Sequence, residues 1–223
     1  MIKEKYTLET TVIGSDDSQS TYEIHRTWNT QKKKAIIIEL YPTISVSCPD
    51  TLDLSTLHLL NHMRELDIGS VRILNLYSKV QSGKPSATTL NEDIENLAYI
   101  SDVFEEADIS DYLIILAWGS SLSKHIPTIN TKLHILRALK EKGLSVNTVQ
   151  LFTEYLDTST ISGVHPLYMG LHFSKDIWSL VPYPIDEEIT QLTKETSPDI
   201  QMKTVVKGGK QKKCTTESKT DLK

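Results

Sequence analysis

The chain has 223 residues and a formal net charge of −5, from 24 Lys and Arg against 29 Asp and Glu. Residues 201–223 carry seven Lys and two acidic residues, a net of +5, which leaves −10 on residues 1–200. This negative net charge on residues 1–200 argues against non-specific electrostatic binding of nucleic acid. Two Cys form neither a disulfide framework nor a zinc motif, and no apolar run reaches the ~18 residues of a membrane span. The N-terminal residues lack the apolar segment of a secretory signal, so we expect a soluble cytoplasmic protein.

The first third of the chain predicts a β-hairpin and a buried strand. Residues 7–28 alternate polar and apolar side chains around a turn-forming segment at 14–18, the pattern of a hairpin. Residues 35–40 are β-branched and nearly all apolar, which predicts a strand buried on both faces. Pro42 ends this strand because proline supplies no N–H to a ladder. A polar loop is expected to follow over residues 43–53.

The middle of the chain predicts a helix, a strand and a second helix. Leu and Met recur at helical spacing over residues 54–66, and Gly69 is a plausible stop. Residues 71–76 are mostly apolar, which indicates a second strand. Thr89 with Glu92 has the spacing of a capping box for the next helix.

The last third predicts two more strands around a helix. Residues 111–118 form an apolar run, residues 128–142 a basic amphipathic helix closed by Gly143, and residues 148–152 a short strand. Strands that alternate with helices predict an α/β fold with a mainly parallel sheet. Ligands in such sheets bind beyond the carboxyl ends of the strands. We therefore expect the site among the residues that follow each strand.

The domain organisation is expected to be simple. Residues 1–195 predict a single domain, and residues 196–223 predict a basic, disordered tail without apolar periodicity. His58 and His62 lie four residues apart on one predicted helix, but no third metal ligand is evident, so a solvated polar face is the preferred interpretation. No cofactor is expected, and the oligomeric state is left open.

Four short motifs stand at the predicted strand ends: Leu40-Tyr41-Pro42, Ile73-Leu74-Asn75, Leu116-Ala117-Trp118-Gly119-Ser120 and His165-Pro166-Leu167. Taken in order, they resemble the motifs of the uracil-DNA glycosylase superfamily. The closest resemblance is to an uncharacterised bacterial branch with Asn-Pro-Ser-Thr, Asn-Leu, Ala-Trp-Gly and His-Pro-Leu motifs, and it covers roughly residues 5–175. It implies a uracil-DNA-glycosylase-like three-layer α/β fold with a central, mainly parallel sheet.

The resemblance also implies roles for individual residues. A glycosylase holds a flipped base in a pocket. Asn75 would read the Watson–Crick edge with its amide. His165 would donate a hydrogen bond where negative charge develops, as the candidate electrophile. The implied substrate-binding residues are Tyr41, Pro42, Asn75, Trp118 and His165, and the residues implied to wedge into DNA or bind a partner are Pro166, Leu167, Tyr168 and Met169.

The sequence departs from the resemblance at Tyr41, which stands where the superfamily has an Asp or Asn that positions the attacking water. A phenol titrates near pH 10 and is a poor general base at neutral pH. Asp50 or Asp53 in the next loop are candidate substitutes. Loss of a positioned acid/base group typically costs ~10²–10⁴-fold in rate. No residue is therefore assigned as catalytic with certainty, and Tyr41 is interpreted as a pocket-filling aromatic.

Three hypotheses follow. The first is a pseudo-enzyme that binds DNA or an acidic inhibitor protein that imitates DNA. The second is an active DNA glycosylase for a modified or unusual base. The third is a plain α/β interaction scaffold, with the motif order coincidental. An acidic partner needs a local basic groove, for which the candidates are Lys79, Lys84, Lys124, Lys132 and Arg137.

Overall fold

The computed structural model describes residues 1–83, 85–157 and 163–196. The strands are β1 (Glu9–Gly14), β2 (Thr21–Thr27), β3 (Lys33–Glu39), β4 (Ile68–Asn75), β5 (Tyr112–Leu116), β6 (Thr148–Phe152) and β7 (Ser179–Pro182). The α-helices are α1 (Leu54–His62), α2 (Ile94–Phe104), α3 (Ile126–Glu141), α4 (Pro166–Phe173) and α5 (Ile185–Glu195). The predicted tail lies outside the described residues apart from its first residue, Thr196.

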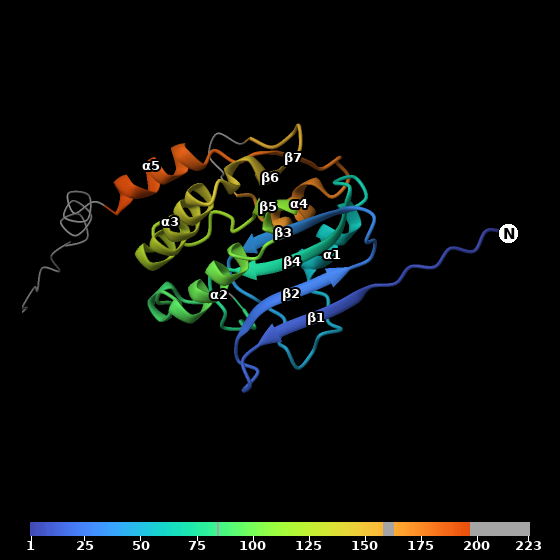
Figure 1. Ribbon diagram of the computed structural model, residues 1–223, viewed down its shortest axis with the longest axis horizontal. Coiled ribbons are helices and arrows are strands. Elements are labelled where there is room, and N and C mark those ends of the chain that lie inside the picture. The colour runs from blue at the N-terminus through green and yellow to red at the C-terminus, as the bar shows by residue number, and fades with distance from the viewer. Residues whose placement is uncertain (84, 158–162, 197–223) are drawn as a thin grey trace, which may run out of the picture.

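The strands form one sheet in the order β1-β2-β4-β3-β5-β6-β7 (Figure 1). The four central strands β4, β3, β5 and β6 are parallel to one another. The β1–β2 hairpin at one edge and β7 at the other are antiparallel. The predicted mainly parallel sheet is therefore confirmed, and the parallel strands bring the ends of β3 and β5 to the same edge.

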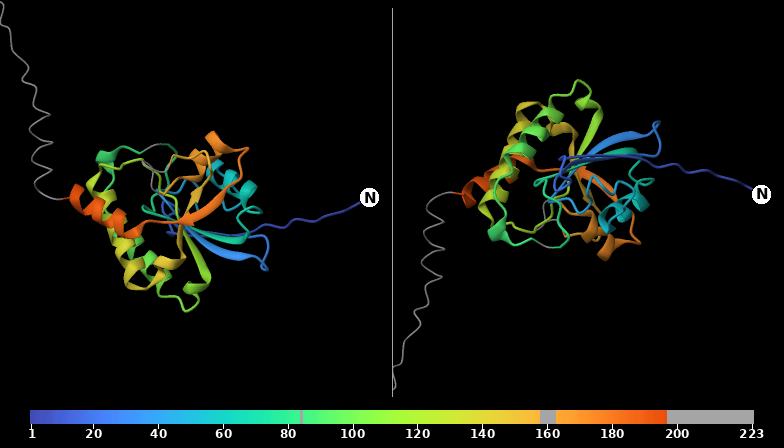
Figure 2. Two further views of the ribbon diagram at one scale, coloured as in Figure 1. Left: turned by 90° about the horizontal axis from the view of Figure 1, so that it is seen from above. Right: turned by 90° about the horizontal axis from the view of Figure 1, so that it is seen from below.

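Helices cover both faces of the sheet. Figure 2 shows α2, α3 and α5 on one side and α1 with α4 on the other. The core divides accordingly into two clusters of buried apolar side chains. Along β3, Ile36 and Ile38 belong to the first cluster, whereas Ala35 and Ile37 belong to the second. This alternation explains why β3 is apolar at successive positions, and it confirms the three-layer α/β fold.

The helix boundaries differ from those predicted at two places. Helix α1 ends at His62, and Gly69 lies inside β4, so its prediction as a helix stop is wrong. A Cβ at Gly69 would lie 1.9 Å from the backbone oxygen of Asn29, so glycine is needed there for close backbone approach. The predicted cap by Thr89 and Glu92 is also wrong, because the Asp93 carboxylate caps α2 instead.

The predicted solvated face of His58 and His62 is wrong as well. The His62 ring is buried and stacks on Trp178 with ring centroids 3.9 Å apart. The His58 ring packs where a Cβ on Gly170 of α4 would stand. Among the residues with described positions, no group of three or more His, Cys, Asp or Glu side chains could hold a metal ion. In the same part of the chain, no helix combines the length and apolarity needed to cross a bilayer.

Candidate functional site

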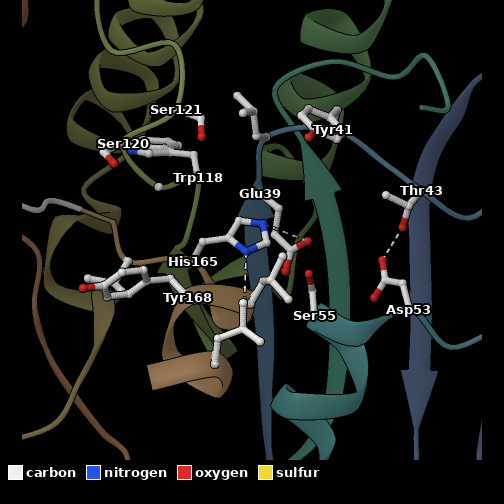
Figure 3. Close-up of a pocket in the computed structure, with 15 residues that line it drawn as sticks. Glu39, Tyr41, Thr43, Asp53, Ser55, Trp118, Ser120, Ser121, His165 and Tyr168 are labelled. Atoms are coloured by element: carbon white, nitrogen blue, oxygen red, sulfur yellow. Dashed lines mark hydrogen bonds and ion pairs between the residues drawn. The ribbon is translucent and has the colours of Figure 1, made fainter. Parts of the chain in front are cut away.

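A pocket of about 350 Å³ lies at the carboxyl ends of β3 and β5, beside the first turns of α1 and α4 (Figure 3). This is the edge at which ligands bind in parallel α/β sheets. Its polar lining comes from four chain segments far apart in sequence. The described lining residues are Glu39, Leu40, Tyr41, Thr43, Asp53, Ser55, Trp118, Gly119, Ser120, Ser121, Val164, His165, Leu167, Tyr168 and Leu171.

His165 is held at the start of α4 by its own cap. The Leu167 backbone N–H donates to His165 Nδ1 at 3.1 Å, and Pro166 occupies the first helical position. Because an amide N–H can only donate, Nδ1 must carry a lone pair. The neutral ring therefore bears its hydrogen on Nε2. Protonating Nδ1 would break the cap, which favours the neutral imidazole.

Glu39 faces this imidazole from the end of β3. Its Oε2 lies 3.8 Å from His165 Nε2, and only 7% of the residue is exposed (Figure 3). Burial raises the pKa of Glu39 to about 8, with a further contribution from the negative charge of Asp53. Burial lowers the pKa of His165 to about 4, although Asp53 opposes this. The usual order of the two pKa values is inverted, so at pH 7 a carboxylic acid faces a neutral imidazole.

Asp53 lines the pocket from the first turn of α1. One carboxylate oxygen accepts from Thr56 N at 2.7 Å and caps the helix, and the other accepts from the Thr43 hydroxyl. The buried Arg26 holds the loop before it, donating to the Thr51 carbonyl at 2.6 Å. Of the two predicted substitutes for the missing acid, Asp53 is at the pocket, whereas Asp50 is exposed and does not line it.

The wall after β5 is fixed by backbone geometry. Gly119 has a φ of +68° and donates its N–H to the Gly163 carbonyl at 2.7 Å. Gly163 also has a φ of +68°, and a Cβ there would lie 2.8 Å from Trp118 Nε1. Behind the wall, the Lys132 ammonium lies 5.1 Å from the Trp118 ring centroid. Trp118 is thus packed as a wall of the pocket.

The structure brings together five of the residues singled out in the sequence and leaves four outside the pocket. Tyr41, Trp118 and His165 line it, together with Leu167 and Tyr168 from α4. Those outside are Pro42, Asn75, Pro166 and Met169.

The four residues outside the pocket are all buried in the fold. Asn75 is buried, and its carbonyl accepts from the Asn96 amide at 2.7 Å, so its predicted role at a base edge has no support in the lining. Met169 is fully buried in the core between α1, α4 and the sheet, where it cannot wedge into a partner. Pro42, which follows Tyr41, and Pro166, which follows His165, are both buried.

Sequence reasoning missed Glu39. Its signal is present, because an acidic residue follows three Ile in a strand predicted to be buried on both faces. Buried carboxyl groups are rare unless they are paired or functional. The predicted basic groove is wrong at Lys132, which is 5% exposed and points into the fold. Lys84 lies outside the described residues, and Lys79, Lys124 and Arg137 are exposed.

Fold and site together define a three-layer α/β protein with a buried carboxyl–imidazole pair at its strand-end pocket. The chain belongs to the family described as "Protein of unknown function (DUF1643)", which matches residues 21–167, more than half of the chain. The matched region runs from β2 into the first turn of α4 and includes Glu39, Asp53, Trp118 and His165. Neither a curated protein nor a solved structure matches the chain.

Proposed function

We propose that the protein is a DNA glycosylase that hydrolyses the N-glycosidic bond of a modified or unusual base. The observation that carries this proposal is the Glu39–His165 pair in the pocket. The binding-only hypothesis rested on the loss of an acid at Tyr41 and on the net charge of −10 on residues 1–200. Glu39 supplies a carboxyl group two residues earlier, and strongly perturbed titratable pairs in a pocket are typical of catalytic sites.

The proposed reaction assigns one role to each member of the pair. In its ionised form, Glu39 takes a proton from water as the water oxygen bonds to C1′ of the sugar. The C1′–N bond breaks, and its electron pair stays on the leaving base. His165 Nε2–H donates a hydrogen bond to the base as electron density gathers there. Glu39 returns its proton to solvent, a base that departs as an anion takes up a proton from solvent, and the products are the free base and an abasic sugar.

The pocket dimensions and lining support a base as the ligand. Its volume of about 350 Å³ lies within the range of ~300–1,000 Å³ common for small-molecule sites. Tyr41 and Tyr168 offer aromatic surface of the kind that holds an extruded base. Exposed apolar side chains stand beside the opening, with Leu171 at 64% exposed and Tyr168 at 38%. They are suited to contact the duplex around the extruded nucleotide.

The test is single-turnover base release from single- and double-stranded oligonucleotides that contain uracil or a panel of modified bases. Glu39→Gln and His165→Asn are compared with wild type, and Glu141→Gln, an exposed carboxylate of α3, is the matched control. We expect release by wild type and control, and a fall of ~10²–10⁴-fold in Glu39→Gln. His165→Asn keeps a capping side chain at α4 and tests the donor role.

Two results would contradict the proposal. One is release by Glu39→Gln at the wild-type rate, which would remove the assigned general base. The other is no release by wild type from any oligonucleotide. In that second case, release by Tyr41→Asp or Tyr41→Asn would instead support a binding protein that has lost its chemistry at one position.

A further inference from the structure

We infer that the pocket selects a base that carries a positive charge, such as a ring-N-alkylated purine, over a neutral base. The inference rests on the proposed function and names its substrate class. It starts from the lining, in which Glu39 and Asp53 are acidic and none of the described residues is Lys or Arg. Lys132 contacts Trp118 and Gly119 from behind the wall and does not line the pocket.

The second observation is the environment of the Glu39 carboxyl group. More than nine-tenths of the residue is buried, yet its carboxyl group accepts no hydrogen bond from any residue that the structure describes. His165 Nε2 is 3.8 Å from its Oε2, beyond hydrogen-bonding distance. Figure 3 shows the carboxyl group pointing toward the space between His165 and Ser55. A buried carboxyl group with open acceptor positions is suited to a ligand that brings positive charge and N–H donors.

Aromatic side chains add to this preference. In Figure 3, Tyr41 and Tyr168 lie on opposite sides of the Glu39–His165 pair. The face of a phenol ring attracts a cation within about 6 Å of its centroid. The Trp118 ring is already approached by Lys132, so we assign this role to the two tyrosines only.

The charge of the ligand also bears on catalysis. The groups that face Glu39 are His165 at the start of α4, Asp53 and Ser55 at the start of α1, and Tyr41 just after β3. None of them supplies a positive charge at pH 7. A neutral base therefore leaves Glu39 protonated, whereas a cationic base favours its ionised form. When the C1′–N bond breaks, the electron pair neutralises the cationic ring, and water delivers its oxygen to C1′ and its proton to Glu39.

A direct binding test uses two planar probes that differ in charge. N1-methylnicotinamide is a permanent cation, and nicotinamide is its neutral counterpart. Isothermal titration at pH 7 should show the cation binding tighter by on the order of tenfold. The preference should fall in Glu39→Gln and persist in the control Glu141→Gln. Titrations in buffers of different ionisation enthalpy should show proton release as the cation ionises Glu39.

Equal affinities, no binding of N1-methylnicotinamide, or an unchanged preference in Glu39→Gln would each overturn the inference. Asp53→Asn adds a variant that keeps the α1 cap, since Asn is also a good capping residue. Its charge preference should fall too.

A second measurement separates this inference from the proposed function. Wild type is compared on oligonucleotides that contain 7-methylguanine or uracil. Faster release of 7-methylguanine supports both proposals. Release of uracil alone would sustain the glycosylase proposal and overturn the inference. Tighter binding of the cationic probe without release of any base would sustain the inferred charge preference and overturn the glycosylase proposal.

Discussion

Replacing Glu39 by Gln tests the physical basis of the site through stability rather than activity. Gln has nearly the same shape but does not ionise. In the folded protein the pKa of Glu39 is about 8, whereas an ordinary Glu has a pKa of 4.5. The folded protein therefore binds one more proton than the unfolded chain between these two pH values. Stability must fall as pH rises through this window, because deprotonation favours the unfolded state.

The magnitude follows from the difference between the two pKa values. At about 1.4 kcal/mol for each pH unit, ionising Glu39 in the folded state costs about 5 kcal/mol in total. This cost is absent near pH 4.5 and complete above pH 8. A folded domain is commonly stable by only ~5–15 kcal/mol. We therefore expect Glu39→Gln to be clearly more stable than wild type at pH 9 and close to it at pH 5.

Urea unfolding followed by tryptophan fluorescence at pH 5, 6, 7, 8 and 9 measures this effect. The informative quantity is the difference between wild type and Glu39→Gln, since other titrating groups cancel from it. Glu141→Gln is the control and should run parallel to wild type at every pH. Parallel stability curves for wild type and Glu39→Gln would refute the assignment of a buried, neutral Glu39.

Two further predictions concern stability. The pKa of His165 is about 4 in the folded protein against an ordinary 6.5, so acid favours the unfolded chain. Between pH 6.5 and 4, wild type should therefore lose about 3 kcal/mol of stability that His165→Asn does not lose. Equal losses for the two proteins in urea titrations would contradict this. Gly170→Ala places a Cβ 1.9 Å from the His58 ring between α1 and α4 and should cost about 1–3 kcal/mol in urea unfolding. Gly83→Ala, with nothing within 4 Å, should cost little, and equal effects would refute the packing argument.

The parallel part of the sheet could be predicted from the sequence because its strands are buried on both faces. Ile36, Ile37 and Ile38 are all fully buried, so the apolar run is continuous and its position is clear. Helix α5 was missed because only one side of it is covered. Ile185 and Leu192 are buried, while most positions between them are exposed, and the polar majority leaves no apolar pattern that predicts a helix.

The site could be predicted in outline but not in its central residue. Tyr41 and Trp118 follow β3 and β5 closely and line the pocket, because the carboxyl ends of parallel strands share one edge. His165 reaches the same pocket from the N-cap of α4, well beyond the end of β6, so its predicted place at a strand end is wrong. Glu39 was overlooked because it lies within its strand, two residues before the motif position. The N-cap geometry that fixes the His165 tautomer is also beyond a sequence pattern, since it depends on how α4 starts.

The energetic cost of Glu39 bears on why such a residue occupies the end of β3. Gln in its place would keep the shape of the side chain and avoid the loss of about 5 kcal/mol at high pH. The fold itself therefore gains nothing from an ionisable group there. Residues that lower stability are commonly those that serve function, because active sites require buried, incompletely satisfied polar groups. The free-energy cost of ionising Glu39 is thus a physical argument for a ligand whose positive charge lowers this cost, as a cationic base would.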